Sequence, residues 1–413
     1  MNKTLLIIGF VWPEPKSSAA GSRMMQLIYF FKSEGYQITF ASSSSRTERS
    51  SNLEQFGISL KQIELNNASF DKFIETLQPE VVLFDRFMTE EQFGWRVAEH
   101  CPKALRILDT EDLHGLRKAR ELAYKSGKPW EDSFLVNDIS KREIASIFRS
   151  DLSLIISEVE MDLLDQYFKV DKSLLHYLPF LLDSISKTDI EDSPEFENRQ
   201  NFITIGNFLH EPNYQSVLYL KEEIWPLIRK KLPKAELHIY GAYASQKVDQ
   251  LHNVKEGFLI KGFAEDAIEV MKQARVCLAA LPFGAGLKGK VIDAMQSGTP
   301  CVMSSVAAEG IFGDFQYNGF VTDIPEEFAE KAIALYSKTS LWEDKHMAGF
   351  KVINQRFNKL YFYDLFSEKL REFRENLEIY RQQNFIGQML QHHQLQSTKY
   401  LSKWIEEKNK EKT

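Results

Sequence analysis

A glycine-rich segment with two lysines, between Leu281 and Gly310, constrains the fold of this chain more than any other part of it. It reads LPFGAGLKGKVIDAMQSGTPCVMSSVAAEG, which predicts a buried strand, a glycine loop and a helix from about Lys290. Gly298 then ends the helix and Cys301 begins the next strand. Strand, turn, helix and strand in this order form a βαβ unit of a parallel sheet.

The glycine loop itself has the properties of a phosphate site. Gly284, Gly286 and Gly289 let the backbone approach a ligand closely, and Lys288 and Lys290 supply positive charge. The start of the helix adds unpaired amides and the positive end of its dipole. The alternative is an ordinary turn, but a structural turn gains nothing from two like charges held close together.

Asp293 lies one turn inside the same predicted helix. A carboxylate at that position can accept two hydrogen bonds from a ribose diol. The spacing of loop, lysines and Asp293 therefore predicts a nucleotide diphosphate held by the loop and the helix, with its ribose held by Asp293.

The start of the chain predicts a second substrate-facing loop. A strand over Thr4 to Phe10 leads into the loop WPEPKSSAAGS, whose Gly21 precedes a helix with Arg23 in its first turn. Ligands of doubly wound sheets bind at the carboxyl ends of the strands, so this loop can touch a substrate and Arg23 can reach an anion. The alternative is a flexible surface loop with Arg23 in a helix salt bridge.

A third cluster of polar residues follows a strand over Leu105 to Leu108. The segment DTEDLHGLRKAR brings Asp109, Glu111, Asp112 and His114 to the carboxyl end of that strand. A carboxylate beside a histidine suits general acid/base or orienting roles. The alternative is a helix start with Asp109 or Asp112 as its N-cap.

The remaining pattern indicates two αβ series followed by long helices. Ser157 and Glu160 have the spacing of a capping box at the start of a helix. A second series opens with a strand over Phe202 to Ile205 and a helix over Gln215 to Lys231, and long helices are predicted over about Leu341 to Asn376. We expect a first domain over residues 1–183, a linker over 184–200, a second domain over 201–350, helices crossing back to the first domain over 351–378, and a tail over 379–413.

Composition restricts the partners and the compartment. A net charge of −7 argues against nucleic acid as the main partner, because phosphate backbones attract basic surfaces. Cys101, Cys277 and Cys301 have no paired spacing, which predicts buried thiols in a reducing cytosol for the latter two. Pro13 and Pro15 interrupt the apolar start, which reads better as a strand than as a secretory signal, and no window is long enough for a membrane span. We expect a cytoplasmic protein.

The tail after residue 378 has a different pattern. Its apolar residues recur at spacings of three and four, which predicts an amphipathic helix or helix pair. These residues are Phe385, Ile386, Met389, Leu390, Tyr400, Leu401, Trp404 and Ile405. The apolar face could pack on the rest of the chain, on a second copy or a partner chain, or lie peripherally on the inner face of the membrane.

With these residues in place, the chain resembles the GT-B glycosyltransferases, and within them the retaining family 4 group that uses nucleotide-diphosphate sugars. The resemblance is carried by IGNFLHEPNYQSVLYLKEEIWPLIRKKLPKAELHIYG and by FGAGLKGKVIDAMQSGTPCVMSSVAAEG, and more weakly by DTEDLHGLR. It implies an α/β fold of two Rossmann-like doubly wound domains that face a cleft. It also implies that the nucleotide lies in the second domain, that the acceptor is held mainly by the first, and that catalysis needs no metal or other cofactor.

The resemblance also assigns residues of the second domain. Asp293 stands at the second position of the family's E-x7-E pair, which holds the ribose, and Ala285 stands where the first glutamate would be. Glu309 resembles part of a second loop that approaches the donor. The backbone at Gly262 and Phe263 would contact the base.

Other assignments concern the loops that face the sugar. Asn207 lies in the loop GNFLHEPNY, which has neither of the basic residues usual there, so that Lys288 and Lys290 would replace them. The family's histidine after the fourth or fifth strand corresponds to Glu111, Asp112 or His114.

Together these observations predict a glycosyltransferase that moves a sugar from a nucleotide-diphosphate sugar to an acceptor hydroxyl, with retention, in glycan or glycoconjugate synthesis. Asp112, His114, Lys288 and Lys290 are the expected catalytic residues. The acceptor would be a carbohydrate, a lipid-linked molecule or a protein. The alternatives are a sugar-nucleotide epimerase of the same fold and a non-catalytic partner of another transferase.

Overall fold

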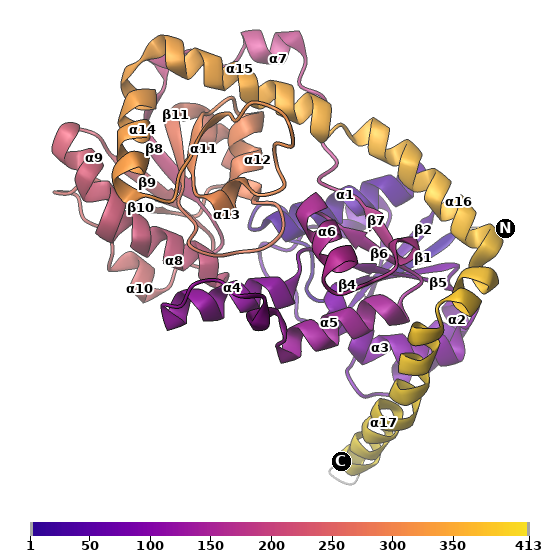
Figure 1. Ribbon diagram of the computed structural model, residues 1–413. Helices are drawn as coiled ribbons and strands as arrows, with labels where there is room; N and C mark the ends of the chain where they lie inside the picture. Colours follow the sequence, from indigo (N-terminus) through magenta and orange to yellow (C-terminus); the bar gives the residue numbers. More distant parts are fainter. Residues whose placement is uncertain (1–2, 411–413) are drawn as a thin grey trace.

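A computed structural model describes residues 3 to 410 of the 413-residue chain. These residues form two α/β domains, each built on one parallel sheet, and two long helices that run from the second domain back over the first (Figure 1). This is the doubly wound arrangement that the sequence predicts.

The first domain contains a seven-stranded sheet in the order β3-β2-β1-β4-β5-β6-β7. The strand order reverses between β1 and β4, which places a topological switch point, where such folds bind ligands, at the carboxyl ends of these two strands, and β5 is the next strand along. The strands are β1 (Thr4–Gly9), β2 (Gln37–Ser42), β3 (Ser59–Gln62), β4 (Val81–Asp85), β5 (Leu105–Asp109), β6 (Leu152–Ile155) and β7 (Leu175–Tyr177).

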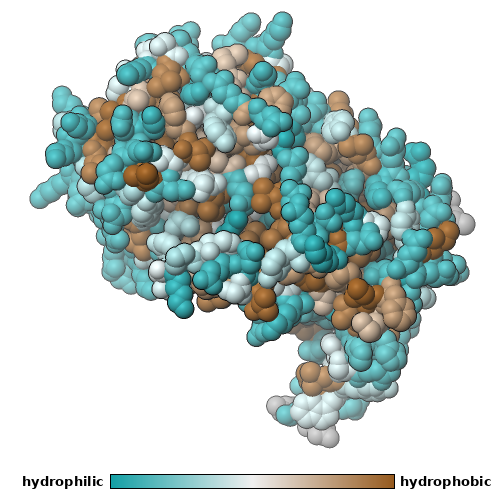
Figure 2. All heavy atoms as spheres, in the orientation of Figure 1, coloured by the Kyte–Doolittle hydropathy of each residue, from teal (hydrophilic) through white to brown (hydrophobic). Residues whose placement is uncertain are grey.

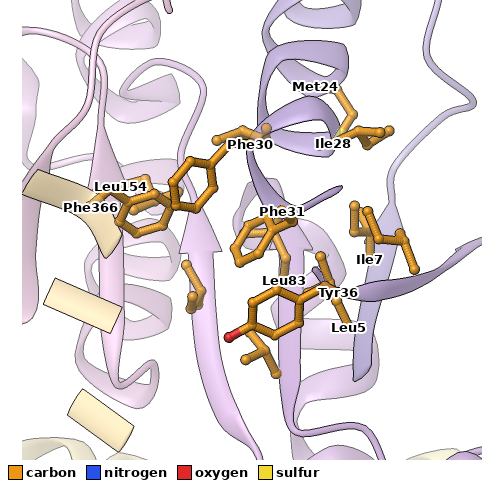
Figure 3. Packing of buried hydrophobic residues seen from close by; sticks show 14 of the residues in the cluster. Leu5, Ile7, Met24, Ile28, Phe30, Phe31, Tyr36, Leu83, Leu154 and Phe366 are labelled. Atoms are coloured by element: carbon orange, nitrogen blue, oxygen red, sulfur yellow. The ribbon is translucent and has the colours of Figure 1, made fainter. Parts of the chain in front are cut away.

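Helices cover both faces of this sheet, because all but one of the residues of β1 and all residues of β4 are buried and need apolar partners on each side. One face packs on a cluster that contains Phe30, Phe31 and Phe366, which Figure 3 shows between α1, the sheet and the late helix α16. The helices are α1 (Ala19–Ser33), α2 (Ser69–Leu77), α3 (Arg86–His100), α4 (His114–Ser126), α5 (Asp138–Arg149) and α6 (Glu158–Gln166), with short 3₁₀ turns η1 (Leu53–Phe56), η2 (Asp132–Leu135) and η3 (Lys172–Leu174).

The second domain contains a six-stranded sheet in the order β10-β9-β8-β11-β12-β13. All neighbouring strands are parallel. The strands are β8 (Gln200–Ile205), β9 (Leu237–Tyr240), β10 (Phe258–Gly262), β11 (Ala274–Ala279), β12 (Cys301–Met303) and β13 (Gly319–Val321). Cys277 and Cys301 lie in adjacent strands and are buried free thiols, as predicted.

The helices of the second domain also lie on both sides of its sheet. One apolar cluster joins the sheet to α12 and α15, and another joins it to α8, α9 and α14. The helices are α7 (Lys187–Glu191), α8 (Glu211–Tyr219), α9 (Trp225–Lys231), α10 (Gln246–Asp249), α11 (Ala267–Gln273), α12 (Gly289–Gln296), α13 (Ser305–Ala308), α14 (Pro325–Ser337) and α15 (Thr339–Arg356), with a 3₁₀ turn η4 (Phe196–Asn198) and a π turn η5 (Leu220–Ile224).

The chain crosses between the domains twice, and the two crossings lie side by side. The amide of Leu182 donates to the carbonyl of Phe357, and the amide of Lys359 donates to the carbonyl of Leu182, each at 2.8 Å. The long helical segment that the sequence predicts is therefore divided at Phe357. Helix α15 stays on the second domain, whereas α16 (Lys359–Gln383) packs on the first.

The tail forms one helix, α17 (Phe385–Lys410), which lies along α3 and α5 of the first domain. Its packed side is largely polar: Arg96 donates to Ser402, Gln394 donates to the carbonyl of Glu91, and Lys399 pairs with Glu99 at 2.6 Å. The opposite side exposes apolar residues, and Figure 2 shows hydrophobic atoms among hydrophilic ones on this projecting helix. The tail thus packs on the chain's own body, but through its polar side and not through the apolar face as predicted.

Two local predictions are wrong. The helix predicted over Gln215 to Lys231 begins earlier, at Glu211, and is interrupted by the π turn η5 before Trp225. The predicted capping box at the start of α6 is not formed either. The Ser157 side chain makes no capping hydrogen bond, and the Glu160 carboxylate bonds to amides of other segments instead.

Candidate functional site

The glycine–lysine loop, residues 282 to 288, lies between β11 and α12 and against the first domain. Gly286 has a φ of +64°, and a Cβ added to it would lie 2.7 Å from the Cβ of Asp112. A Cβ added to Gly289 would lie 2.7 Å from the Cβ of Ala19. Both contacts are too short for a side chain. In this structure the glycines thus allow the first domain to approach the loop.

Both lysines of this region are buried, but their surroundings differ. Lys288 is 7% exposed and Lys290 is 8% exposed, and burial lowers the pKa of each to about 8. The ammonium of Lys288 donates to the carbonyl of Gly286 at 2.7 Å. The ammonium of Lys290 forms no hydrogen bond or ion pair with any residue between 3 and 410. It is therefore a buried positive charge without a partner, in the first turn of α12.

Asp293 lies one turn further along α12, partly exposed. Burial, with a smaller contribution from the charge of Asp266, raises its pKa to about 7. Asp293 is thus within one helical turn of Lys290, as predicted, and its carboxylate forms no ion pair with any residue between 3 and 410. A ribose hydroxyl pair could donate to it.

The segment after β5 brings Asp112, His114 and Arg117 together. Nε2 of His114 lies 3.3 Å from Oδ1 of Asp112, and Arg117 donates to Oδ2 of the same carboxylate. Burial opposes ionisation of Asp112, but Arg117 and His114 outweigh it and hold its pKa below the usual range. Burial also lowers the pKa of His114 to about 3. The pair is therefore an ionised carboxylate and a neutral imidazole. Neither Asp109 nor Asp112 caps α4, whose N-cap is Leu113.

Two further charged residues at this sheet edge have unusual backbones. Arg86 follows β4 with a φ of +70°, and Glu111 follows β5 with a φ of +66°. Their charged groups lie 3.8 Å apart, and burial raises the pKa of Glu111 to about 8. Left-handed backbone in residues other than glycine is uncommon and concentrates at functional sites. Sequence reasoning missed Arg86.

An ion pair between the domains involves Arg120, which sequence reasoning also missed. Its guanidinium donates to both carboxylate oxygens of Glu309 at 2.9 and 2.7 Å, and to the carbonyl of Gly284 at 2.8 Å. Glu309 therefore lies near the glycine–lysine loop, and its carboxylate is occupied by the first domain. The signal available in the sequence was a pair of arginines, Arg117 and Arg120, one turn apart after the polar cluster.

Gly21 and Arg23 have structural surroundings instead of the expected contact with an anion. Arg23 is 1% exposed; it forms an ion pair with Asp109 at 2.8 Å and donates to the carbonyl of Leu178 at 2.7 Å. Gly21 is buried, and a Cβ added to it would lie 2.4 Å from the backbone of Glu14. Because its guanidinium is used in these contacts, Arg23 ties α1 to β5 and to the end of β7.

Gly262 and Phe263 lie at another contact between the domains. Gly262 has a φ of +77° and its carbonyl accepts from the amide of Gly241 at 2.8 Å. The guanidinium of Arg49, from the first domain, lies 4.7 Å from the ring centre of Phe263 and 4.8 Å from that of Tyr243. The ring of Phe263, whose backbone is expected to contact the base, is thus in contact with an arginine in this structure.

Asn207 shapes the loop after β8. Its side-chain oxygen accepts from the amide of Leu209 at 2.9 Å, and its carbonyl accepts from the Asn213 side chain at 2.9 Å. The contacts fix the turn between β8 and α8, which lies at the same sheet edge as α12.

Residues 3 to 410 contain neither a cluster of metal ligands nor a membrane-spanning helix. In this range no group of three or more His, Cys, Asp or Glu side chains is placed to hold a metal ion. Within the same part of the chain, no helix combines the length and the apolar content needed to cross a bilayer.

The chain is similar to one family of sequences and to several solved structures. Residues 199–338 match the family described as glycosyl transferases group 1. No curated protein matches the chain. Among solved structures, sucrose-phosphate synthase from Thermosynechococcus elongatus aligns with 12% identity and a TM-score of 0.66, over 90% of this chain and 99% of the other.

Two other solved structures align with the chain at a similar identity and coverage. HepE of Anabaena, in complex with UDP and glucose, aligns with 14% identity and a TM-score of 0.65, over 90% of this chain and 100% of that one. A glycosyltransferase from Rickettsia africae aligns with 13% identity and a TM-score of 0.62, over 92% and 98%. At these identities the likeness shows the fold. The chain has the GT-B fold, and its second domain carries the sequence pattern of glycosyl transferases group 1.

Proposed function

We propose that this protein is a glycosyltransferase that moves a sugar from a nucleotide-diphosphate sugar to an acceptor hydroxyl. The observation that carries the proposal is the buried ammonium of Lys290, which lacks a partner within residues 3 to 410 and lies in the first turn of α12. An unpaired buried charge is costly, and a diphosphate placed at this helix end would remove that cost.

In this proposal the second domain stabilises the leaving group. As the bond between sugar and diphosphate breaks, negative charge grows on the phosphate oxygens, and Lys290 and the first amides of α12 face that charge. Lys288 already bonds to the carbonyl of Gly286, so it would act mainly by holding its own loop in shape. Asp293 would accept from the ribose.

The first domain would hold the sugar and the acceptor. The neutral imidazole of His114 can exchange hydrogen bonds with a sugar hydroxyl without adding positive charge, since its pKa is about 3. Asp112 stays ionised through Arg117 and can accept a hydrogen bond from a hydroxyl. These two residues therefore supply the acceptor side of the proposed reaction.

The finer points of the proposal rest on the resemblance described above. They are transfer with retention, chemistry without a metal, and an acceptor that is a carbohydrate, a lipid-linked molecule or a protein. The complex of HepE with UDP and glucose supports uridine diphosphate as the first nucleotide to test.

The test is a thermal-shift screen of UDP, GDP and ADP and their sugars, followed by product analysis with and without acceptors. One nucleotide should raise the melting temperature in a concentration-dependent manner. Conversion of the donor sugar without any acceptor would identify an epimerase instead. If no nucleotide raises the melting temperature and the protein copurifies with another transferase, the proposal fails in favour of a non-catalytic partner.

A further inference from the structure

Glu160, in the first turn of α6, connects the two domains at the glycine–lysine loop. Its Oε1 accepts from the amide of Gly286 at 2.8 Å and from the amide of Leu113 at 3.0 Å. Gly286 belongs to the second domain, whereas Leu113 precedes α4 of the first. One carboxylate oxygen therefore joins the loop that carries Lys288 to the segment that carries Asp112 and His114.

The position of Glu160 departs from the usual capping pattern at the start of a helix. A glutamate three residues after a serine at a helix start normally turns back to cap that helix. Here Ser157 makes no capping bond, and its hydroxyl and the Oε2 of Glu160 are both buried without hydrogen-bond partners. Departures of this kind from local preference are typical of functional sites, where a tertiary requirement outweighs local stability.

The charge of Glu160 is also not neutralised by a close cation among residues 3 to 410. Its side chain is fully buried, and no ion pair includes it. Burial, and next the charge of Asp112, raise its pKa to about 7, while Lys288 opposes this rise. A carboxylate placed only for stability would not be buried beside another carboxylate with one oxygen unbonded.

The start of α6 touches the second domain at two further points. A Cβ added to Gly310 would lie 2.5 Å from the hydroxyl of Ser157, and Glu158 pairs with Arg356 at 2.5 Å. Three residues at the start of α6 thus lie against the second domain: Ser157 against Gly310, Glu158 against Arg356 at the end of α15, and Glu160 against the glycine–lysine loop. Glu160 is the one of the three that bonds to the loop backbone.

We propose that Glu160 is a positioning residue through which the first domain holds the glycine–lysine loop in the shape that receives the diphosphate. The reference to a diphosphate rests on the proposed function, whereas the hold on the loop does not. Glu160 itself need not touch the substrate, because it acts through the amide of Gly286. Separation of the domains would release that amide and leave the loop free to change shape.

The test compares three variants by hydrogen exchange of the ligand-free protein, read from peptides that cover residues 282 to 291. Glu160→Ala should speed exchange in this loop by about 10-fold, because it removes two hydrogen bonds. Glu160→Gln retains an acceptor oxygen and should stay within about 3-fold of the wild type. Glu90→Ala is the matched control, because Glu90 is a buried carboxylate paired with Arg149 inside the first domain. Its loss should lower the stability of the protein without raising the rate of hydrogen exchange in the glycine–lysine loop.

Equal loop exchange in Glu160→Ala and wild type would overturn the inference, and so would faster exchange of the same size in Glu90→Ala. A second measurement, titration calorimetry with UDP, should give an affinity at least about 10-fold weaker for Glu160→Ala than for wild type and Glu90→Ala. Unchanged affinity in Glu160→Ala would count against the inference. Failure of the wild type to bind any nucleotide diphosphate would instead contradict the proposed function, and the exchange result would still decide the role of Glu160.

Discussion

The two domains each bury a basic residue near the start of a helix at the carboxyl edge of the sheet, but the two residues differ in whether a carboxylate neutralises them. Arg23 of the first domain is 1% exposed and is neutralised by Asp109 at 2.8 Å. Lys290 of the second domain is 8% exposed and has no ionic or hydrogen-bonding partner within residues 3 to 410. The sequence predicts an anion contact for both. The difference shows that a buried charge indicates a ligand only when the fold leaves it unpaired.

The physical reason is the cost of removing a charge from water. A buried guanidinium is stable when a carboxylate and carbonyl groups surround it, as Leu178 and Asp109 do for Arg23. The Lys290 ammonium lacks such neighbours, and burial lowers its pKa to about 8. In the proposed function, an anion bound beside Lys290 would remove the cost of this unpaired charge.

Removal of Arg23 should give the largest effect on stability. Arg23→Met leaves the buried Asp109 carboxylate unpaired, which should lower the free energy of unfolding by about 3 to 5 kcal/mol. Urea unfolding measures this, and the double variant Arg23→Met/Asp109→Leu should recover part of the loss. A stable Arg23→Met protein with weakened nucleotide binding would show that Arg23 belongs to the ligand site and would break the comparison.

Removal of Lys290 should affect activity instead of stability. Lys290→Ala should reduce turnover by about 100-fold or more, because it removes a charge that faces the leaving group, while the unfolding free energy stays the same or rises. Steady-state kinetics and urea unfolding measure the two quantities. Lys288→Ala is the comparison variant and should reduce turnover less, because Lys288 bonds within its own loop. Equal activity of wild type and Lys290→Ala would refute the role of this residue.

The affinity for UDP should depend on pH through the lysines. Their pKa values are about 8 in the empty site, so both are charged below pH 7 and become neutral above pH 8. A bound diphosphate favours the charged form, so the dissociation constant should rise about 10-fold per pH unit above 8 for each lysine that must take up a proton. Calorimetry between pH 7 and 9.5 measures this. Lys290→Arg keeps its charge and should give a shallower dependence, whereas a flat profile for the wild type would exclude the mechanism.

The smallest effect is expected at Asp293. Its pKa is raised to about 7 by burial, so the folded state binds the proton more tightly than the unfolded chain, and ionisation costs stability as the pH rises from about 4 to 7. Asp293→Asn should therefore raise the melting temperature by about 2 to 4 °C at pH 8 and change it little at pH 4.

The same variant should bind UDP about 5- to 10-fold more weakly, since an amide offers the ribose one acceptor atom in place of two. Calorimetry at pH 8 tests this part. Unchanged affinity for UDP would show that Asp293 does not contact the nucleotide. Of the two α12 side chains tested, Lys290 alone would then be left as a contact with the nucleotide.

Much of the fold could be predicted because it depends on short-range patterns. The continuous apolar run at Val81 becomes β4, the mostly apolar segment at Leu105 becomes β5, and Gly298 ends α12 where predicted. Such runs are long enough to require burial on both sides, and glycine has a clear preference for the left-handed backbone at a helix end.

The pairing of charges could not be predicted, because it depends on contacts between distant segments. Arg23 meets Asp109 86 residues later, and Arg120 meets Glu309 189 residues later. Glu160 is the clearest example. Its spacing from Ser157 satisfies the capping rule, but its carboxylate accepts from the amide of Gly286, 126 residues away, instead of from the start of its own helix. Local reasoning finds many residues of the candidate site, misses Arg86 and Arg120, and misassigns the partners of others.

The crossing of α16 back to the first domain has a consequence for biosynthesis. Phe366 of α16 stacks on Phe30 of α1 (Figure 3) with ring centres 4.7 Å apart, and Phe362, Leu370 and Phe373 belong to the same buried cluster. A ribosome produces α1 more than 300 residues before these side chains. We therefore expect the nascent first domain to keep an apolar face uncovered until translation of α16 is complete, so that the second domain, although made later, is the first to finish folding.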